Sequence, residues 1–253
     1  MAKLRLKSTH DEVKLELPAI LPRGRRQTST ALRITLCVLL DLSVSMNING
    51  ALEKALGGFR RFWAELLGDE VLKLQLEFSL VGFSDRPHVI KPYGPADDWD
   101  MEAALGDLPR GTSTHLGEAM LRQFEDHEAY VDSLRAKGLG VRGSILVVLT
   151  DGLPNGSEDA YERACRKARQ FEKRGERAIF GIAVAGADLK LLSRLTPEPM
   201  ELASIESFEH LWTWLLDSVK QVSSTRMGEE VELEDPYLSP DNKSGWAKPP
   251  VRF

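Results

Sequence analysis

The stretch that decides the fold is LCVLLDLSVSM, residues 36–46. The apolar run that begins at Ile34 ends at Leu40, and the carboxylate of Asp41 follows at once. So short an apolar run is typical of a strand buried on both faces, as in the centre of a parallel sheet. Asp41 is then expected at the carboxyl end of the strand, where open α/β sheets place their binding sites.

Two hydroxyl side chains, Ser43 and Ser45, follow Asp41 at alternate positions. One loop can therefore aim a carboxylate and two hydroxyl oxygens at a common point. Such hard-oxygen ligands suit Mg²⁺, Mn²⁺ or Ca²⁺ and suit zinc poorly. The same residues could instead cap the helix that follows. A motif of three residues does not decide between these interpretations, so the decision depends on the rest of the chain.

The composition is that of an ordinary globular chain of 253 residues, 42% hydrophobic and 28% charged, with a formal net charge of -5. A slightly acidic balance gives no reason to expect a nucleic-acid or membrane surface. The two distant cysteines, Cys37 and Cys165, indicate a reducing compartment and no disulfide framework. No apolar run approaches the ~18 residues of a membrane span, and the N-terminus lacks a signal-peptide pattern. We therefore expect a cytoplasmic protein.

Strand patterns alternate with helix patterns, which predicts a doubly wound α/β fold. The expected strands cover residues 31–40, 74–83, 88–93, 144–150, 179–184 and 200–203. The expected helices cover residues 50–67, 100–108, 115–137, 157–174, 188–195 and 208–222. The turn at 84–87 is too short for a crossover helix, so strand 88–93 must run antiparallel to strand 74–83. The polar residues on one face of strand 74–83 suit a position nearer the sheet edge.

The two ends of the chain are expected to lie outside this domain. Residues 1–30 predict an N-terminal extension with one or two short strands that could pair as an edge hairpin. Residues 223–253 predict an acidic and then proline-rich tail that is irregular or draped over the domain. The domain itself is expected to span residues 31–222.

Two further polar segments are expected at the same edge of the sheet as Asp41. Thr112 and Thr114 lie in the turn that opens the long helix, and Asp151 follows the buried strand 144–150. Three separate segments thus supply hydroxyls and carboxylates to one edge. This convergence favours a metal site over coincidental helix capping.

The motifs DLSVS (41–45), THLGEA (114–119) and TDG (150–152) together resemble the von Willebrand factor A (VWA) domain with its metal-ion-dependent adhesion site (MIDAS). The resemblance implies a Rossmann-like fold with a mostly parallel six-stranded sheet, one antiparallel edge strand and helices on both faces. Two positions depart from the family pattern: Val44 replaces a common glycine, and Arg110 replaces the first glycine of Gly-Gly-Thr. The metal ligands that the resemblance implies are Asp41, Ser43, Ser45, Thr114 and Asp151, with Thr112 as the alternative to Thr114.

A finer resemblance lies in the closing helix. The segment FEHLWTWLLDSV (208–219) is similar to the bacterial cytoplasmic subgroup found with tellurite-resistance clusters, the TerY type. That resemblance implies a stress-response or phage-defence system, with a PPM-type phosphatase and a protein kinase as partners.

The function we expect is a metal-dependent protein-interaction module with no catalytic residues. Mg²⁺ held by neutral hydroxyls and two carboxylates keeps positive charge and an open coordination position, which an Asp or Glu of a protein partner would fill. Capture of that carboxylate could shift the 112–114 loop and act as a switch.

Two other function classes remain open. A strand-end aspartate could be the nucleophile of a metal-dependent phosphoryl-transfer enzyme, but such phosphatases need a second carboxylate two residues on, where this chain has Ser43. The chain has no P-loop or dinucleotide fingerprint and no zinc spacing among its histidines. His115 is expected to be a solvated histidine at a helix start and not a base. The third class is a structural scaffold whose site stays empty.

Overall fold

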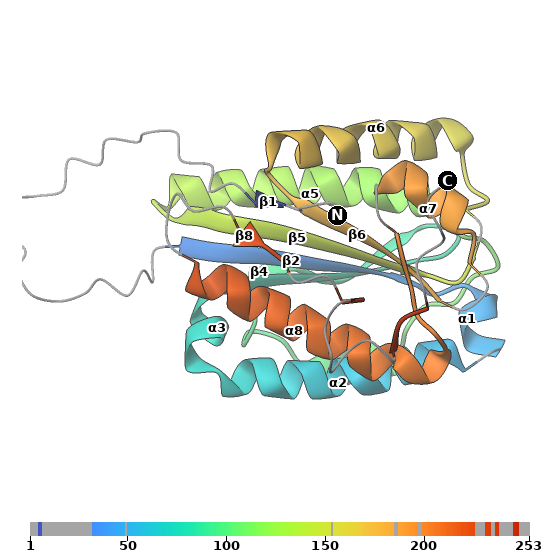
Figure 1. The fold of residues 1–253 in the computed structure, drawn as a ribbon, viewed down its shortest axis with the longest axis horizontal. Coiled ribbons are helices and arrows are strands. Elements are labelled where there is room, and N and C mark those ends of the chain that lie inside the picture. Colours follow the sequence, from blue (N-terminus) through green and yellow to red (C-terminus); the bar gives the residue numbers. More distant parts are fainter. Residues whose placement is uncertain are drawn as a thin grey trace, which may run out of the picture.

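The computed structural model describes residues 5–6, 32–48, 50–152, 154–184, 187–196, 199–225, 231–233, 236–237 and 245–247. Its centre is a six-stranded sheet (Figure 1). In spatial order the strands are β4 (Pro87–Pro95), β3 (Leu76–Phe83), β2 (Leu32–Asp41), β5 (Gly140–Thr150), β6 (Ala178–Ala183) and β7 (Met200–Glu201). All neighbouring pairs are parallel except β3 and β4. The predicted α/β class, the mostly parallel sheet and its antiparallel edge strand are therefore confirmed.

The position of strand β2 in the sheet explains the apolar run at residues 36–40. It lies between β3 and β5, and alternate side chains enter two different cores. Leu36 and Val38 pack into one core, whereas Cys37 and Leu39 pack into the other. A strand covered on both faces has no solvent-facing side, so the positions from Leu36 to Leu40 are all apolar before the strand ends at Asp41.

Helices cover both faces of the sheet, as predicted (Figure 1). One face carries α2 (Ala51–Gly68), α3 (Glu70–Gln75) and α8 (Phe208–Ser224). The other face carries α5 (Leu116–Ala136), α6 (Glu158–Arg174) and α7 (Leu189–Leu195). Shorter connecting elements are α1 (Val44–Ile48), α4 (Met101–Gly106) and the 3-10 helix η1 (Ile205–Ser207). Within the described residues, no helix combines the length and apolar character that a membrane span requires.

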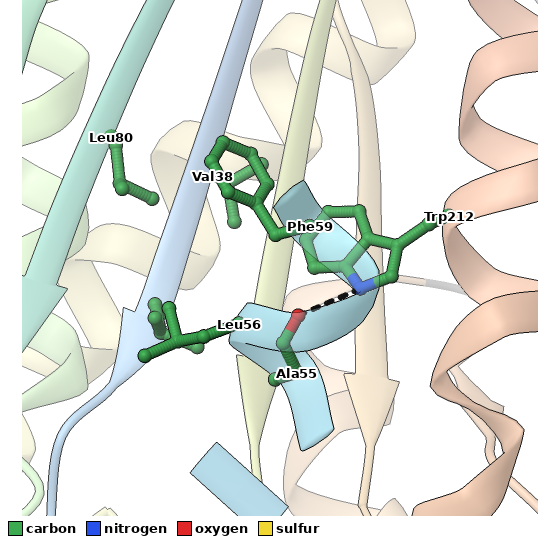
Figure 2. A pocket seen from close by; sticks show the side chains of 7 residues that line it. Val38, Ala55, Leu56, Phe59, Leu80 and Trp212 are labelled. Atoms are coloured by element: carbon green, nitrogen blue, oxygen red, sulfur yellow. Dashed lines mark hydrogen bonds between the residues drawn. The ribbon is translucent and has the colours of Figure 1, made fainter. Parts of the chain in front are cut away.

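Trp212 joins α8 to α2 beneath the sheet. Its indole Nε1 donates a hydrogen bond to the carbonyl oxygen of Ala55 at 3.0 Å (Figure 2). The ring centroids of Phe59 and Phe62 lie 5.3 Å and 5.6 Å from that of Trp212. The small cavity beside these rings is lined by apolar residues, namely Val38, Leu40, Ala55, Leu56, Phe59, Leu80 and Trp212. Because it offers no convergent polar groups, we interpret it as a gap in the packing and not as a ligand site.

The predicted strand 74–83 begins later than expected. Residues 70–75 form α3, and β3 starts at Leu76. The carboxylate of Asp69 accepts hydrogen bonds from the backbone N–H groups of Val71 and Leu72, which caps the extra helix. Leu74, counted as a strand residue in the sequence, is exposed on α3. A second short helix, α1, occupies part of the region expected to be loop.

The described parts of the N-terminal extension and of the C-terminal tail form strand pairs that the sequence pattern did not predict. The backbone of β1 (Arg5–Leu6) pairs antiparallel with β8 (Val231–Glu232), so this part of the extension pairs with the tail. Trp246 forms a β-bridge with Leu202 beside the edge strand β7 and packs into the core. The rest of the predicted N-terminal hairpin lies outside the described residues, and the division at residues 30 and 222 stays a prediction.

Candidate metal-ion site

The loop that begins at Asp41 (the first loop) and the loop that begins at Asp151 leave the sheet from neighbouring parallel strands. In the β2–β5 register Leu40 is paired with Leu149, so Asp41 and Thr150 lie at the same edge of the sheet. The Thr150 hydroxyl donates a hydrogen bond to Asp41 Oδ2 at 2.6 Å. Asp151, the next residue, therefore enters the same space as Asp41.

Both serines of the first loop join these carboxylates. The backbone N–H of Ser43 donates to Asp41 Oδ1 at 2.8 Å, which folds the loop back on the strand end. The hydroxyl oxygens of Ser43 and Ser45 are 2.9 Å apart, and Ser45 Oγ donates to Asp151 Oδ1 at 2.8 Å. Four of the five predicted ligands thus form one continuous hydrogen-bonded array.

Thr114 brings the third loop to the same point. Its side chain is 4% exposed, and a methyl group placed on Gly152 would lie 3.3 Å from Thr114 Oγ1 and 3.9 Å from Asp41 Oδ2. The Thr114 hydroxyl and the Asp41 carboxylate therefore face one small space beside Gly152. Thr112, the alternative, is exposed. The structure brings all five predicted ligand residues together, and of the two threonines its geometry favours Thr114.

The loop that carries Thr114 is fixed from two sides. The backbone N–H of Thr114 donates to Asn155 Oδ1 at 2.6 Å, and Asn155 N–H donates back to the Thr114 carbonyl oxygen at 3.2 Å. On the other side, Asp85 Oδ1 accepts hydrogen bonds from the backbone N–H groups of Thr112 and Ser113 at 3.1 Å and 2.8 Å. These bonds, led by the one from Ser113, lower the pKa of the Asp85 carboxyl.

Sequence reasoning missed these supporting residues. Asp85 lies in the turn after β3, the neighbour of β2, separated from the strand by Ser84 alone, so its place near a strand end was a signal like the one that identified Asp41 and Asp151. Asn155 lies beyond the Asp-Gly turn, and nothing in its local sequence points to Thr114. A backbone bond from Val44 N–H to the Gly111 carbonyl oxygen, 3.0 Å, also joins the first and third loops.

The electrostatics of the site favour a cation. Asp41 is fully buried, and burial raises the pKa of its carboxyl, although hydrogen bonds from Thr150 and Ser43 act in the opposite direction. Burial likewise raises the pKa of Asp151, which the hydrogen bond from Ser45 opposes. Within the described part of the chain, no lysine or arginine pairs with either carboxylate. A bound cation would supply the charge that these two desolvated groups lack.

The kinds of atoms present agree with a hard divalent ion. No group of three or more His, Cys, Asp or Glu residues among those described is placed to hold a metal. The site instead combines two carboxylates with three hydroxyls, and oxygen ligands of this kind suit Mg²⁺ or Ca²⁺ better than a soft metal. The residues therefore fit a Mg²⁺-like ion.

Comparison with known proteins finds similarity in structure alone. No protein-family model and no curated protein matches the chain. Among solved structures it is similar to a von Willebrand factor type A protein from Catenulispora acidiphila (TM-score 0.59, 13% identity, covering 75% of this chain and 43% of that one). It is also similar to proximal thread matrix protein 1 from the mussel byssus (TM-score 0.56, 19% identity, covering 80% and 49%).

A further structure of the mussel protein is described as having a zinc-occupied MIDAS motif (TM-score 0.51, 16% identity, covering 75% of this chain and 48% of that one). This chain spans less than half the length of each of these structures. At such low identity the likeness shows the fold: the chain has a von Willebrand factor A fold, as its motifs implied.

Proposed function

We propose that this chain is a metal-dependent protein-interaction module that binds an acidic side chain of a partner through a divalent cation. The observation that carries the proposal is the meeting of two carboxylates and three hydroxyls from three separate loops; Asp41 is buried, Asp151 is half-buried, and neither forms an ion pair with another described residue. The residues that would hold the ion are Asp41, Ser43, Ser45, Thr114 and Asp151. Mg²⁺ fits this oxygen set, and Mn²⁺ or Ca²⁺ could replace it.

Each residue has a defined part in this proposal. Ser43, Ser45 and Thr114 would bind through their hydroxyl oxygens, whereas Asp41 and Asp151 would bind directly or through water. Both oxygens of Asp41 already accept hydrogen bonds, which hold the carboxylate in position. The three hydroxyls are neutral, and a carboxylate that binds through water does not neutralise the ion directly, so a partner's Asp or Glu would be favoured as the remaining ligand.

We propose that the module is not an enzyme. Ser43 stands two residues after Asp41, where a phosphatase with an aspartate nucleophile needs its acid/base carboxylate. His115 lies at the start of α5, half-buried, and its backbone N–H donates to the Ser84 carbonyl oxygen at 2.9 Å. The position of His115 suits a residue that holds the loop before α5 in place, and not a catalytic base.

The setting is also part of the proposal. The segment 208–219 resembles the TerY-type subgroup and lies within helix α8, as expected. On this resemblance we propose a cytoplasmic bacterial protein of a stress-response or defence system, with a PPM-type phosphatase and a protein kinase as candidate partners. Both cysteines are free and buried, in agreement with a reducing compartment.

The proposal is tested by thermal unfolding of the chelated protein with and without millimolar Mg²⁺. At about 100 times its Kd, an ion that binds only the folded state stabilises it by about 2.7 kcal/mol. For a chain of this size that corresponds to a rise of about 5–10 °C in the melting midpoint. Mn²⁺, Ca²⁺ and Zn²⁺ are measured in parallel to rank the metals.

Three variants make the test specific. Asp41→Ala is expected to abolish the response, and Ser45→Ala, at an exposed position, is expected to weaken it without disturbing the fold. Asp132→Ala removes an exposed carboxylate of α5 and serves as the matched control with a full response. If the parent protein responds to none of the metals, the site does not take a cation and the scaffold interpretation replaces this one.

A further inference from the structure

Exposed apolar side chains gather beside the candidate metal site. Helix α1 begins directly after Ser43, and it exposes 39% of Val44 and 77% of Ile48. Within the described residues the other exposed large apolar side chains are Val71, Leu74 and Val89. The first two of these lie on α3, at the opposite end of the sheet from α1 (Figure 1). A five-residue helix that presents two apolar side chains to water next to a proposed ligand site suggests that a partner covers them.

Exposed positive charge borders the same site on the other loops. Arg110 directly precedes Gly111, whose carbonyl oxygen accepts the hydrogen bond from Val44 N–H. Arg86 directly follows Asp85, whose carboxylate holds the backbone of the 112–113 turn. Both arginines are exposed, and neither forms an ion pair with any other described residue. Both arginines are therefore available to a negatively charged partner segment.

We propose that the partner segment carries, besides its coordinating carboxylate, a large apolar side chain that packs on Val44 and Ile48 and a second carboxylate that faces Arg86 and Arg110. This inference rests on the proposed function, because the metal ion fixes the segment between the two features. It goes further by stating which features distinguish the partner segment from other protein segments that expose an Asp or Glu.

Each feature has its own physical contribution. A single metal-bound carboxylate selects poorly, since acidic side chains are common on protein surfaces. Burial of the exposed part of Ile48 and Val44 against an apolar side chain adds affinity in proportion to the apolar area removed from water. The arginines attract acidic segments and disfavour basic ones, chiefly through the association rate. Such a local cationic border offsets the repulsion between this acidic chain and an acidic partner.

The test is an array of nine-residue peptides with a constant central Asp, in which the three positions on each side vary over Leu, Glu, Lys and Ser. Binding of the full chain is measured with Mg²⁺ and with EDTA. We expect Mg²⁺-dependent binding to be strongest for peptides with Leu on one side and Glu on the other, and weakest for peptides with Lys. Varying both sides covers either direction of the bound segment.

Two variants assign the preferences to the surface. Ile48→Ser is expected to lower the affinity for Leu-containing peptides about tenfold while the preference for Glu remains. Arg110→Ser is expected to lower the affinity for Glu-containing peptides about two- to fivefold, an effect that high salt removes. Both variants keep the ligand residues, so their melting response to Mg²⁺ stays that of the parent. Leu74→Ser on α3 and Arg174→Ser at the end of α6 are the matched controls, with no expected change.

The outcomes separate this inference from the proposed function. A parent that responds to Mg²⁺ but binds all Asp peptides equally overturns the inference and leaves the proposed function in place. No response to metal and no Mg²⁺-dependent binding overturns both. Equal losses in the control variants, or a Mg²⁺-dependent dimer that no peptide dissociates, also overturn the inference, the latter because a second copy would then be the occupant.

Discussion

Two neighbouring glycines of α2, Gly57 and Gly58, allow a direct test of how α8 packs on this helix. A methyl group on Gly57 would have nothing within 4 Å, whereas one on Gly58 would overlap Trp212 Cδ1 and lie 2.8 Å from Trp212 Nε1. The Trp212 ring has little room to move, because its Nε1 is hydrogen-bonded to Ala55 and its ring packs against Phe59. The same substitution, one residue apart, should therefore have opposite effects.

The expected magnitudes follow from these contacts. Alanine in a helix interior is favoured over glycine by about 1 kcal/mol, so Gly57→Ala should stabilise the protein by about that amount. Gly58→Ala gains the same contribution but forces an overpacked core, which costs about 1–3 kcal/mol. Displacement of Trp212 also breaks its hydrogen bond to Ala55, worth about 1 kcal/mol. The net effect of Gly58→Ala should be a destabilisation of about 1–3 kcal/mol.

The assay is equilibrium unfolding in urea, followed by tryptophan fluorescence and checked by circular dichroism. The double variant Gly58→Ala/Trp212→Ala removes the ring that clashes, so its free energy of unfolding should exceed the value obtained by adding the effects of the two single changes. Equal stabilisation by Gly57→Ala and Gly58→Ala would refute the described packing of Trp212 across α2.

Two further predictions concern single side chains. Thr114→Ala should abolish the melting response to Mg²⁺ whereas Thr112→Ala should preserve it, and the opposite result would move the ligand to Thr112. Burial raises the pKa of Glu172 from 4.5 to about 7, against the hydrogen bond from Thr196 and the charge of Arg169. Because the pKa is higher in the folded than in the unfolded state, the parent should lose stability as pH rises from about 4.5 through about 7, and Glu172→Gln should lack this loss. Urea unfolding at pH 5 and pH 8 measures the free energy of unfolding of both proteins. From pH 5 to pH 8 the stability of Glu172→Gln should rise relative to that of the parent.

The strand-end residues of the site could be predicted because each follows a pattern that reports burial. Residues 36–40 before Asp41 and residues 145–149 before Thr150 and Asp151 are all apolar, and so short an apolar run is typical of a strand covered on both faces. The order of the parallel strands then places the two carboxylates at one edge. Sequence reasoning succeeded where a local pattern and a general rule of α/β sheets together fix a position.

The residues that were missed depend on contacts between distant segments. Residues 74–75, the last two of helix α3, were predicted as strand because residues 74–83 alternate in polarity, and the rest of α3 was not predicted, because the Asp69 cap at its start is a single side chain. Arg177 gave no signal at all, although it is buried and donates hydrogen bonds to Gln123 Oε1 at 2.8 Å and to the Tyr93 hydroxyl at 3.0 Å. A buried cation needs partners that only the folded chain brings together.

The anchoring of the Thr114 loop limits how the site could act as a switch. If capture of a carboxylate moved Thr114 alone, both hydrogen bonds with Asn155 would break, at a cost of about 1 kcal/mol each. That sum is comparable to the coupling of about 1–3 kcal/mol that an allosteric ligand usually supplies, so little would remain to move a helix. A switch would therefore have to carry Asn155 and the Asp85 turn along with Thr114, as one unit. The alternative is a site that is already formed before the partner binds. In that case none of the partner's binding free energy is used to move the loop.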